Sequence, residues 1–322
     1  MARHGWLVLS VAFWAASVSG QPALYKIDAG PYAVKTIEQL TVHDAVQDRD
    51  ITLRLLYPDA AGPFPLVVFS TGAFCYPQMY GRITDHWVSH GYVVILPNHL
   101  DSPNNAAPPT PDQYADFLPS RVRDVSFVLD AIENIGERAG IDGRIDSGQA
   151  AIAGHSFGAV ISMIKTGLYI RKEYRGSWGD TFDDRFQAAV LLSAPGPAMR
   201  EMTENAFDGL RKPLIATGGT NDVGRIDLGD RTPAEWRRQA FLLAPPGDKY
   251  SVITEGSDHY LGGLICNAER GGEPDHEAVV IIRAMTTAFL DAYVKHDPDA
   301  LRFLNTADVS DLTGGQASYQ AR

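Results

Sequence analysis

A serine between two glycines, at the junction of a short apolar run and a helix-like one, constrains this chain most strongly. The segment 154–158 reads Gly-His-Ser-Phe-Gly; apolar residues precede it over 150–153, and a proline-free, mostly apolar stretch follows over 159–164. A sharp turn from a strand into a helix leaves no room for bulky neighbours, so it favours glycine on both sides of the serine. The pattern predicts that Ser156 is exposed at a helix start, whose positive end favours developing negative charge. An ordinary glycine-rich turn is the alternative.

The order of apolar segments predicts an α/β fold. Residues 36–42 and 51–57 alternate apolar and polar side chains, which predicts a leading antiparallel hairpin. Fully apolar strands are expected over 64–70, 92–96, 150–153, 186–192, 213–217 and 250–254. Amphipathic helices are expected between them near 79–90, over 120–138 and after Ser156, with a closing helix over 276–295. This alternation is typical of a mostly parallel sheet with helices on both faces.

The two ends of the chain differ from its middle. Arg3 and His4 precede an uncharged, largely apolar stretch that runs to Gly20, which predicts a signal peptide over residues 1–20. An uncleaved anchor helix is the alternative, although the apolar core is short for a membrane span. Residues 21–322 are expected to form a single domain without a membrane span, with a polar, frayed tail over about 308–322. The mature protein is therefore expected to be secreted or periplasmic.

A serine hydroxyl needs a base, and that base needs a carboxylate to orient it. In this topology both follow the serine in the chain, each on a loop at the end of a later strand. Asp222 follows the strand 213–217 through two glycines, whereas Asp227 and Asp230 lie further from the strand end. His259 is the histidine on the loop after the strand 250–254. The predicted catalytic residues are therefore Ser156, Asp222 and His259.

An oxyanion hole requires two backbone amides near the serine, one of them from the residue after it. That residue is Phe157, and Ala73, after the strand 64–70, is predicted to supply the second amide, with Phe74 as the neighbouring candidate. Phe74 and Tyr76 are also expected to line the substrate cleft, although aromatic side chains at this density could equally be plain packing.

The chain has two cysteines, Cys75 and Cys266. Cys75 follows the predicted oxyanion loop and Cys266 follows His259. Both loops should therefore meet at the opening of the predicted active site. In an exported protein such a pair favours a disulfide, and two buried free thiols are the alternative.

Several functional classes are disfavoured. The formal net charge is −11 and no run of Lys or Arg is present, which argues against a nucleic-acid partner. No metal or cofactor motif is found, and Gly218-Gly219 and Gly271-Gly272 are interpreted as turns. His99 and Asp101 could be metal ligands at a strand end, but a polar loop explains them better. We therefore expect no metal and no cofactor; the oligomeric state is left open.

These motifs together resemble the α/β-hydrolase superfamily. The resemblance rests on the segments 65–70, 89–94, 101–102, 154–158 and 257–259. Within the superfamily the chain is similar to the branch of chlorophyllases, platelet-activating-factor acetylhydrolases, polyester hydrolases and dienelactone-hydrolase-like proteins. Many relatives have His-Gly where this chain has Thr71-Gly72. Dienelactone hydrolases themselves use a cysteine nucleophile, so that activity is not expected here.

The resemblance implies the α/β-hydrolase fold and assigns the expected roles to Ser156, Asp222, His259 and the amides of Ala73 and Phe157. The predicted function is a secreted serine carboxylic-ester hydrolase that works through an acyl-enzyme. Lipase-like, phospholipid-acyl or polyester hydrolysis at the same three residues is the alternative. A binding protein that has this fold but no catalytic activity is the third hypothesis.

Overall fold

A computed structural model describes residues 23–107, 109–170, 181–197, 202–224, 228–266, 269 and 272–322. The predicted signal peptide lies outside these residues. The described residues form one nine-stranded sheet in the order β1-β2-β4-β3-β5-β6-β7-β8-β9. Its strands are β1 (Val34–Asp44), β2 (Arg49–Pro58), β3 (Phe64–Ser70), β4 (Val93–Pro97), β5 (Ile145–His155), β6 (Phe186–Leu192), β7 (Leu214–Gly219), β8 (Lys249–Thr254) and β9 (Ala317–Ala321).

The sheet is parallel from β4 to β8, while β1 and β2 form an antiparallel hairpin that joins it at β4. This is the α/β-hydrolase fold, and the predicted hairpin and apolar strands are confirmed. Because the strands β3 to β8 run parallel, their carboxyl ends meet at one edge of the sheet, which is where the predicted site residues follow them.

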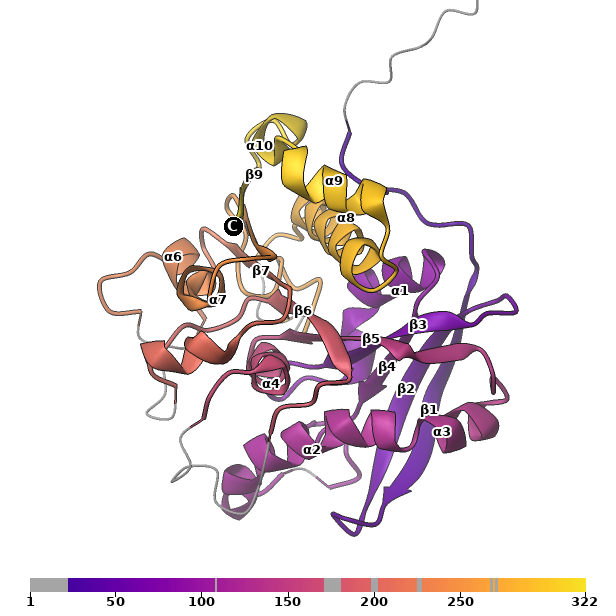
Figure 1. Cartoon of the computed structure of the whole chain (residues 1–322). Coiled ribbons are helices and arrows are strands. Elements are labelled where there is room, and N and C mark those ends of the chain that lie inside the picture. Colours follow the sequence, from indigo (N-terminus) through magenta and orange to yellow (C-terminus); the bar gives the residue numbers. More distant parts are fainter. Residues whose placement is uncertain are drawn as a thin grey trace, which may run out of the picture.

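Helices cover both faces of the sheet, as Figure 1 shows. Side chains from α1 (Gly81–Ser89) and α8 (His276–Tyr293) form one core with Val67 and Phe69 of β3. Side chains from α2 (Phe117–Asp130), α3 (Ile132–Ala139), α4 (Phe157–Thr166) and α7 (Gln239–Leu243) form the other core with Leu66 and Val68. Consecutive residues of β3 thus point to opposite faces, which is why this strand is apolar throughout.

Shorter elements complete the chain. They are the 3₁₀ turns η1 (Pro77–Tyr80), η2 (Pro111–Asp116) and η3 (Glu204–Gly209), and the helices α6 (Pro233–Arg237), α9 (Pro298–Thr306) and α10 (Val309–Leu312). No described helix has the length and apolar character needed to cross a bilayer.

The helix predicted over 120–138 is interrupted. It forms α2 and α3, with Ala131 between them at φ −103° and ψ 9°. Backbone hydrogen bonds from Ala131 to Phe127 and from Ile135 to Ala131 continue across the junction, so the chain changes direction without leaving the helical path. Neither glycine nor proline marks the place, and the apolar pattern therefore could not locate it.

The prediction of a frayed tail over 308–322 is wrong. The tail forms α10 and β9, and β9 pairs antiparallel with β8 from Thr254–Ala317 to Tyr250–Ala321. Most β9 side chains are exposed. This strand is held mainly by backbone hydrogen bonds, so it lacks the apolar pattern from which a strand is predicted.

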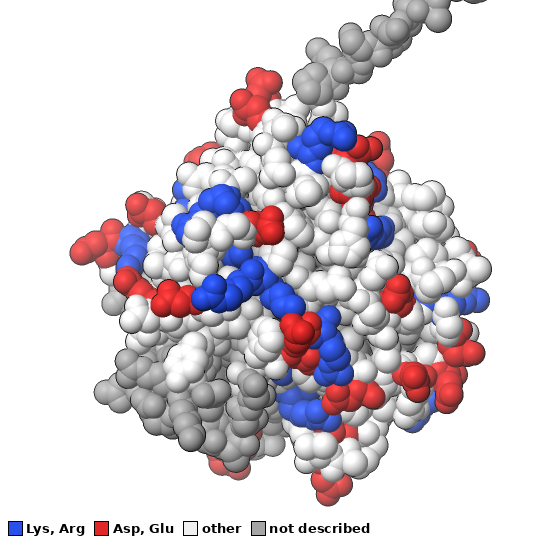
Figure 2. All heavy atoms as spheres, in the orientation of Figure 1, with Lys and Arg blue, Asp and Glu red and all other residues white. Residues whose placement is uncertain are grey.

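The surface on the face shown in Figure 2 carries both signs of charge in close alternation. One described run of ion pairs links Arg123, Asp130, Arg185 and Asp183. Such interspersed charges neutralise one another locally, so this run contributes no field of a single sign.

Candidate active site

The segment 154–158 forms a tight strand-to-helix turn. β5 ends at His155, α4 begins at Phe157, and Ser156 between them has φ 54° and ψ −114°. A Cβ on Gly154 would collide with the carbonyl of Gly158, and a Cβ on Gly158 would collide with the carbonyl of Ser70. Both glycines are therefore required by close backbone approach, and Ser156 is held in a strained conformation of the kind found at functional sites.

The structure brings the three predicted catalytic side chains together. His259 Nε2 lies 2.9 Å from Ser156 Oγ, and His259 Nδ1 lies 2.7 Å from Asp222 Oδ1. Asp222 is fully buried, and His259 is buried except for 8% of its surface. Nδ1 also lies 3.1 Å from Arg237 Nη2, but its contact with the Asp222 carboxylate is shorter. Since a carboxylate can only accept, we assign the proton to Nδ1, which leaves Nε2 free to accept the serine proton. Of the competing carboxylates, Asp230 is exposed and Asp227 lies outside the described residues.

A buried arginine that the sequence analysis missed completes this group. Arg237 of α6 donates from Nε to Asp222 Oδ1 at 2.8 Å and from Nη1 to the carbonyl of Ser193 at 2.9 Å. Burial alone would raise the pKa of Asp222, but the hydrogen bond from His259 and the charge of Arg237 lower it to about 2. Asp222 is therefore ionised at every pH at which the protein would work. In the sequence, Arg237 reads as an ordinary helix arginine.

His155, the residue before the serine, links the neighbouring loops. Tyr80 receives a hydrogen bond from the amide of Gly72 at 2.8 Å and lies 3.0 Å from His155 Nδ1, while His155 Nε2 lies 3.0 Å from the carbonyl of His259. One assignment satisfies all three contacts: Tyr80 donates to Nδ1, and Nε2–H donates to the carbonyl. Burial and the neighbouring His259 lower the pKa of His155 to about 3, so it is neutral.

The two predicted oxyanion-hole amides are those of Phe157 and Ala73. Phe157 is the first residue of α4, where amides have no partner within the helix. Within the described residues, no acceptor is hydrogen bonded to the amide of Phe157 or of Ala73. The Phe74 amide, the neighbouring candidate, instead donates to Asp101 at 3.0 Å. The geometry thus favours Ala73 over Phe74.

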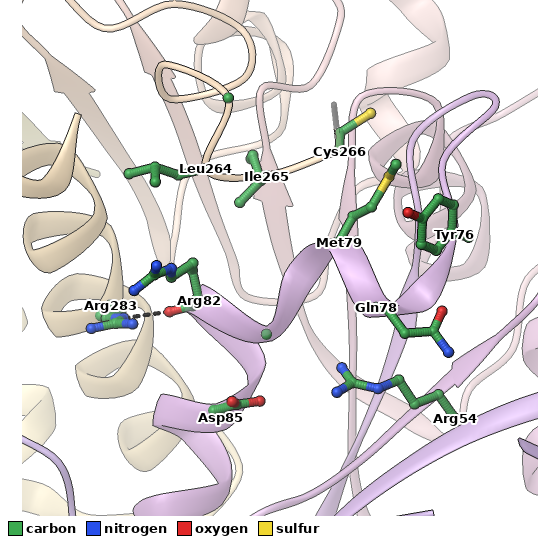
Figure 3. A pocket seen from close by; sticks show the side chains of 12 residues that line it. Arg54, Tyr76, Gln78, Met79, Arg82, Asp85, Leu264, Ile265, Cys266 and Arg283 are labelled. Carbon is green, nitrogen blue, oxygen red and sulfur yellow. Dashed lines mark hydrogen bonds between the residues drawn. The ribbon is translucent and has the colours of Figure 1, made fainter. Parts of the chain in front are cut away.

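The two expected cleft residues lie in different surroundings. Phe74 is 48% exposed and packs edge-on against Tyr114 and Phe117. Tyr76 instead lines a pocket of about 560 Å³ beside Met79 and Cys266. Figure 3 shows this pocket, into which the guanidinium of Arg54 also points. The three predicted catalytic side chains do not line it.

The structure contains the Cys75–Cys266 disulfide, with 5.3 Å between the two Cα atoms and a sequence separation of 191. It ties the loop after β3 to the loop after β8, so the free-thiol alternative is wrong.

His99 and Asp101 are neither exposed loop residues nor part of a group of described His, Cys, Asp or Glu side chains that could hold a metal. His99 bonds to Ser70 at 2.9 Å and to Asp124 at 2.8 Å, and Asp101 forms an ion pair with Arg121. Both residues lie in the polar loop after β4, as expected, but their side chains are buried among their own partners.

Comparison with known proteins agrees with the fold. The family model described as Chlorophyllase matches residues 23–163, a range that includes Ser156 but neither Asp222 nor His259. Two plant proteins, named chlorophyllase-1, chloroplastic, from Citrus sinensis and Citrus unshiu, are each 28% identical over 260 residues. Each match covers 70% of this chain and 76% of the relative. The chain thus has the α/β-hydrolase fold and is similar in sequence to chlorophyllases.

Proposed function

We propose that this protein is a serine carboxylic-ester hydrolase with Ser156, His259 and Asp222 as its catalytic residues. The observation that supports this most is the hydrogen-bonded chain from Ser156 Oγ through the imidazole to the Asp222 carboxylate, at a turn that exposes the serine. A serine, a base and an orienting acid within hydrogen-bond reach are what acyl transfer requires.

The reaction follows from these positions. As Ser156 Oγ attacks the ester carbonyl, His259 Nε2 takes its proton, and Asp222 stabilises the imidazolium. The carbonyl oxygen becomes an anion that accepts hydrogen bonds from the amides of Ala73 and Phe157. The intermediate then collapses, the alcohol leaves with the proton from His259, and the acyl group stays on Ser156. Water, deprotonated by the same imidazole, attacks this acyl-enzyme and releases the acid.

Hydrolysis of p-nitrophenyl esters of increasing acyl length by wild type and by Ser156→Ala tests the proposal. We expect the substitution to lower kcat by at least about 10³-fold, because it removes the nucleophile. Equal turnover by both proteins would refute the assignment of Ser156. If neither protein hydrolyses the esters although both are well folded, the alternative of a non-catalytic binding protein with this fold would be favoured.

The similarity to chlorophyllases supports a second, narrower candidate, an ester bond of chlorophyll. Lipase-like, phospholipid-acyl and polyester substrates are further candidates for the same residues. Detergent-dispersed chlorophyll, a triglyceride emulsion, phosphatidylcholine vesicles and a polyester film, each given to wild type and Ser156→Ala, distinguish them by which acid is released.

We also propose that the protein is exported to the periplasm or secreted, and that the mature chain from about Gln21 acts as a single domain. The apolar stretch before Gly20 and the disulfide both support export. The two plant relatives are named as chloroplastic. Cell fractionation followed by N-terminal sequencing tests this, and a cytoplasmic protein that still begins at Met1 or Ala2 would contradict it.

A further inference from the structure

The loop that carries the Ala73 amide rests on a buried ion pair. Arg121 of α2 donates from Nε to Asp101 Oδ1 and from Nη2 to Asp101 Oδ2, both at 2.8 Å. Both side chains have no exposed surface. Burying two charges is costly, and apolar side chains of similar size often stabilise a core as well or better. The reaction outlined above gives this pair no role.

The remaining polar atoms of the pair hold the loop on both sides of Ala73. Arg121 donates from Nη1 to the carbonyl of Thr71 at 2.6 Å and from Nη2 to the carbonyl of Gly72 at 2.9 Å. Asp101 Oδ2 accepts the amide of Phe74 at 3.0 Å. The backbone is therefore anchored immediately before and immediately after Ala73.

The bond to Gly72 also determines where the Ala73 amide points. The Gly72 carbonyl and the Ala73 N–H belong to one planar trans peptide unit, so they point in opposite directions. An arginine that holds the carbonyl on the buried side turns the N–H away from itself. Arg121 also contacts the residue that carries the second amide, because its guanidinium lies 4.8 Å from the centre of the Phe157 ring.

We infer that Arg121 and Asp101 are positioning residues for the oxyanion hole: they fix the Ala73 amide before the substrate arrives. This inference rests on the proposed function. A donor fixed in advance stabilises the developing charge without reorganisation, whereas a loop that must be ordered during the reaction does so less well. The pair is predicted to act on the transition state and to leave ground-state binding nearly unchanged.

Arg121→Lys is the main test. Lysine keeps the positive charge but has a single nitrogen, which cannot bind both carboxylate oxygens and both carbonyls. We expect kcat for p-nitrophenyl acetate to fall about 10- to 100-fold with KM changed less than about threefold. Affinity for a trifluoromethyl ketone, which forms a tetrahedral adduct with the serine, should fall by the same factor as kcat/KM.

Arg123→Lys is the matched control. Arg123 lies two residues further along α2 and binds the buried Asp44 through two nitrogens, at 3.0 and 3.1 Å. Among the described residues it forms no hydrogen bond or ion pair with the loop 71–75. This variant should lower the melting temperature less than Arg121→Lys does, because Arg123 is partly exposed, and should leave kcat and ketone affinity within about twofold of wild type.

The outcomes separate the possibilities. If Arg121→Lys changes kcat no more than Arg123→Lys does, while Ser156→Ala is inactive, the inference is wrong and the proposed function stands. If Ser156→Ala is as active as wild type, the proposed function itself fails. Should Arg121→Lys not fold, Asp101→Asn serves instead: it keeps the size of the side chain but weakens its hold on Arg121 and on the Phe74 amide. Unchanged kcat and ketone affinity in that variant would equally overturn the inference.

Discussion

Each half of the candidate site contains a buried Arg–Asp ion pair, and the two pairs have different roles. In the proton-transfer half, made of Asp222, Arg237 and His259, the carboxylate accepts from both the arginine and the imidazole. In the oxyanion half, the loop 71–75 with Asp101 and Arg121, the carboxylate accepts from the arginine and a backbone amide. A buried Arg–Asp pair thus orients a side chain in one half and a stretch of backbone in the other.

The halves also differ in how directly they contact the reacting atoms. In the proposed reaction His259 takes the proton from Ser156 and gives it to the leaving alcohol, so any change in Asp222 should act on the chemistry itself. Arg121 and Asp101 act through the backbone on either side of the Ala73 amide. The comparison therefore predicts larger effects on turnover in the proton-transfer half, and the experiments below test that difference.

The largest effect is expected from Asp222→Asn. An amide in place of the carboxylate can donate to the imidazole and so stabilise the wrong tautomer, with the proton on Nε2. We expect kcat to fall about 10⁴-fold, with little change in KM, in steady-state ester hydrolysis. Asp230→Asn, at an exposed carboxylate, is the control. A loss below about tenfold would show that another residue orients His259.

Arg237→Met should act on stability as well as on turnover. It leaves Asp222 buried without its cation, and removing one partner of a buried ion pair costs about 3–5 kcal/mol. Urea unfolding measures this difference. Arg238→Met is the control, because the hydrogen bonds of Arg238 go to Gln320 and Ser318. Equal stability of the two variants would mean that Arg237 contributes nothing to holding Asp222 ionised.

The disulfide joins the two halves, so its removal should affect both. Cys75→Ala with Cys266→Ala opens a loop of 191 residues, and we expect the free energy of unfolding to fall by about 2–4 kcal/mol. Reduction of the wild type should lower the melting temperature to that of the double variant. If reduction leaves the melting temperature unchanged and both thiols react with a thiol reagent under native conditions, the bridge is absent in solution.

The smallest effect concerns His155, which supports both halves through Tyr80 and the His259 carbonyl. Its pKa is near 6.5 when unfolded and about 3 when folded, so between these values the unfolded chain binds a proton that the folded protein does not. Stability should therefore decrease as pH falls from 6.5 to 3, by about 1 kcal/mol per pH unit from this residue.

Urea unfolding of wild type and His155→Gln at several pH values between 7 and 4 measures that contribution. In the variant, the free energy of unfolding should depend less on pH than in wild type. Some dependence should remain, because burial also lowers the pKa of His86 to about 4. The exposed His276, replaced by Gln, should leave the slope unchanged. A His155 variant with the wild-type slope would contradict a neutral, buried imidazole.

Much of the fold and the candidate site could be predicted from the sequence, because the signals are local. The strand-to-helix turn at 154–158 needs small residues within four positions of one another. The parallel strands are apolar because both faces of the sheet are buried. Chain order then limited the acid and base to loops after later strands, and the structure places Asp222 and His259 beside Ser156. The strand β9 escaped because backbone hydrogen bonds, rather than apolar side chains, hold it.

The amino-acid sequence by itself determined the order of strands and helices, the serine turn and the residues able to surround it. Only the tertiary structure decided which arginines are buried ion-pair partners and which are surface charges: Arg121 and Arg237 are buried, whereas Arg123 of the same helix as Arg121 is partly exposed. The physical reason is that the burial and pairing of a charged side chain depend on neighbours 15 to 50 residues away in sequence. The type of the residue itself does not reveal those neighbours.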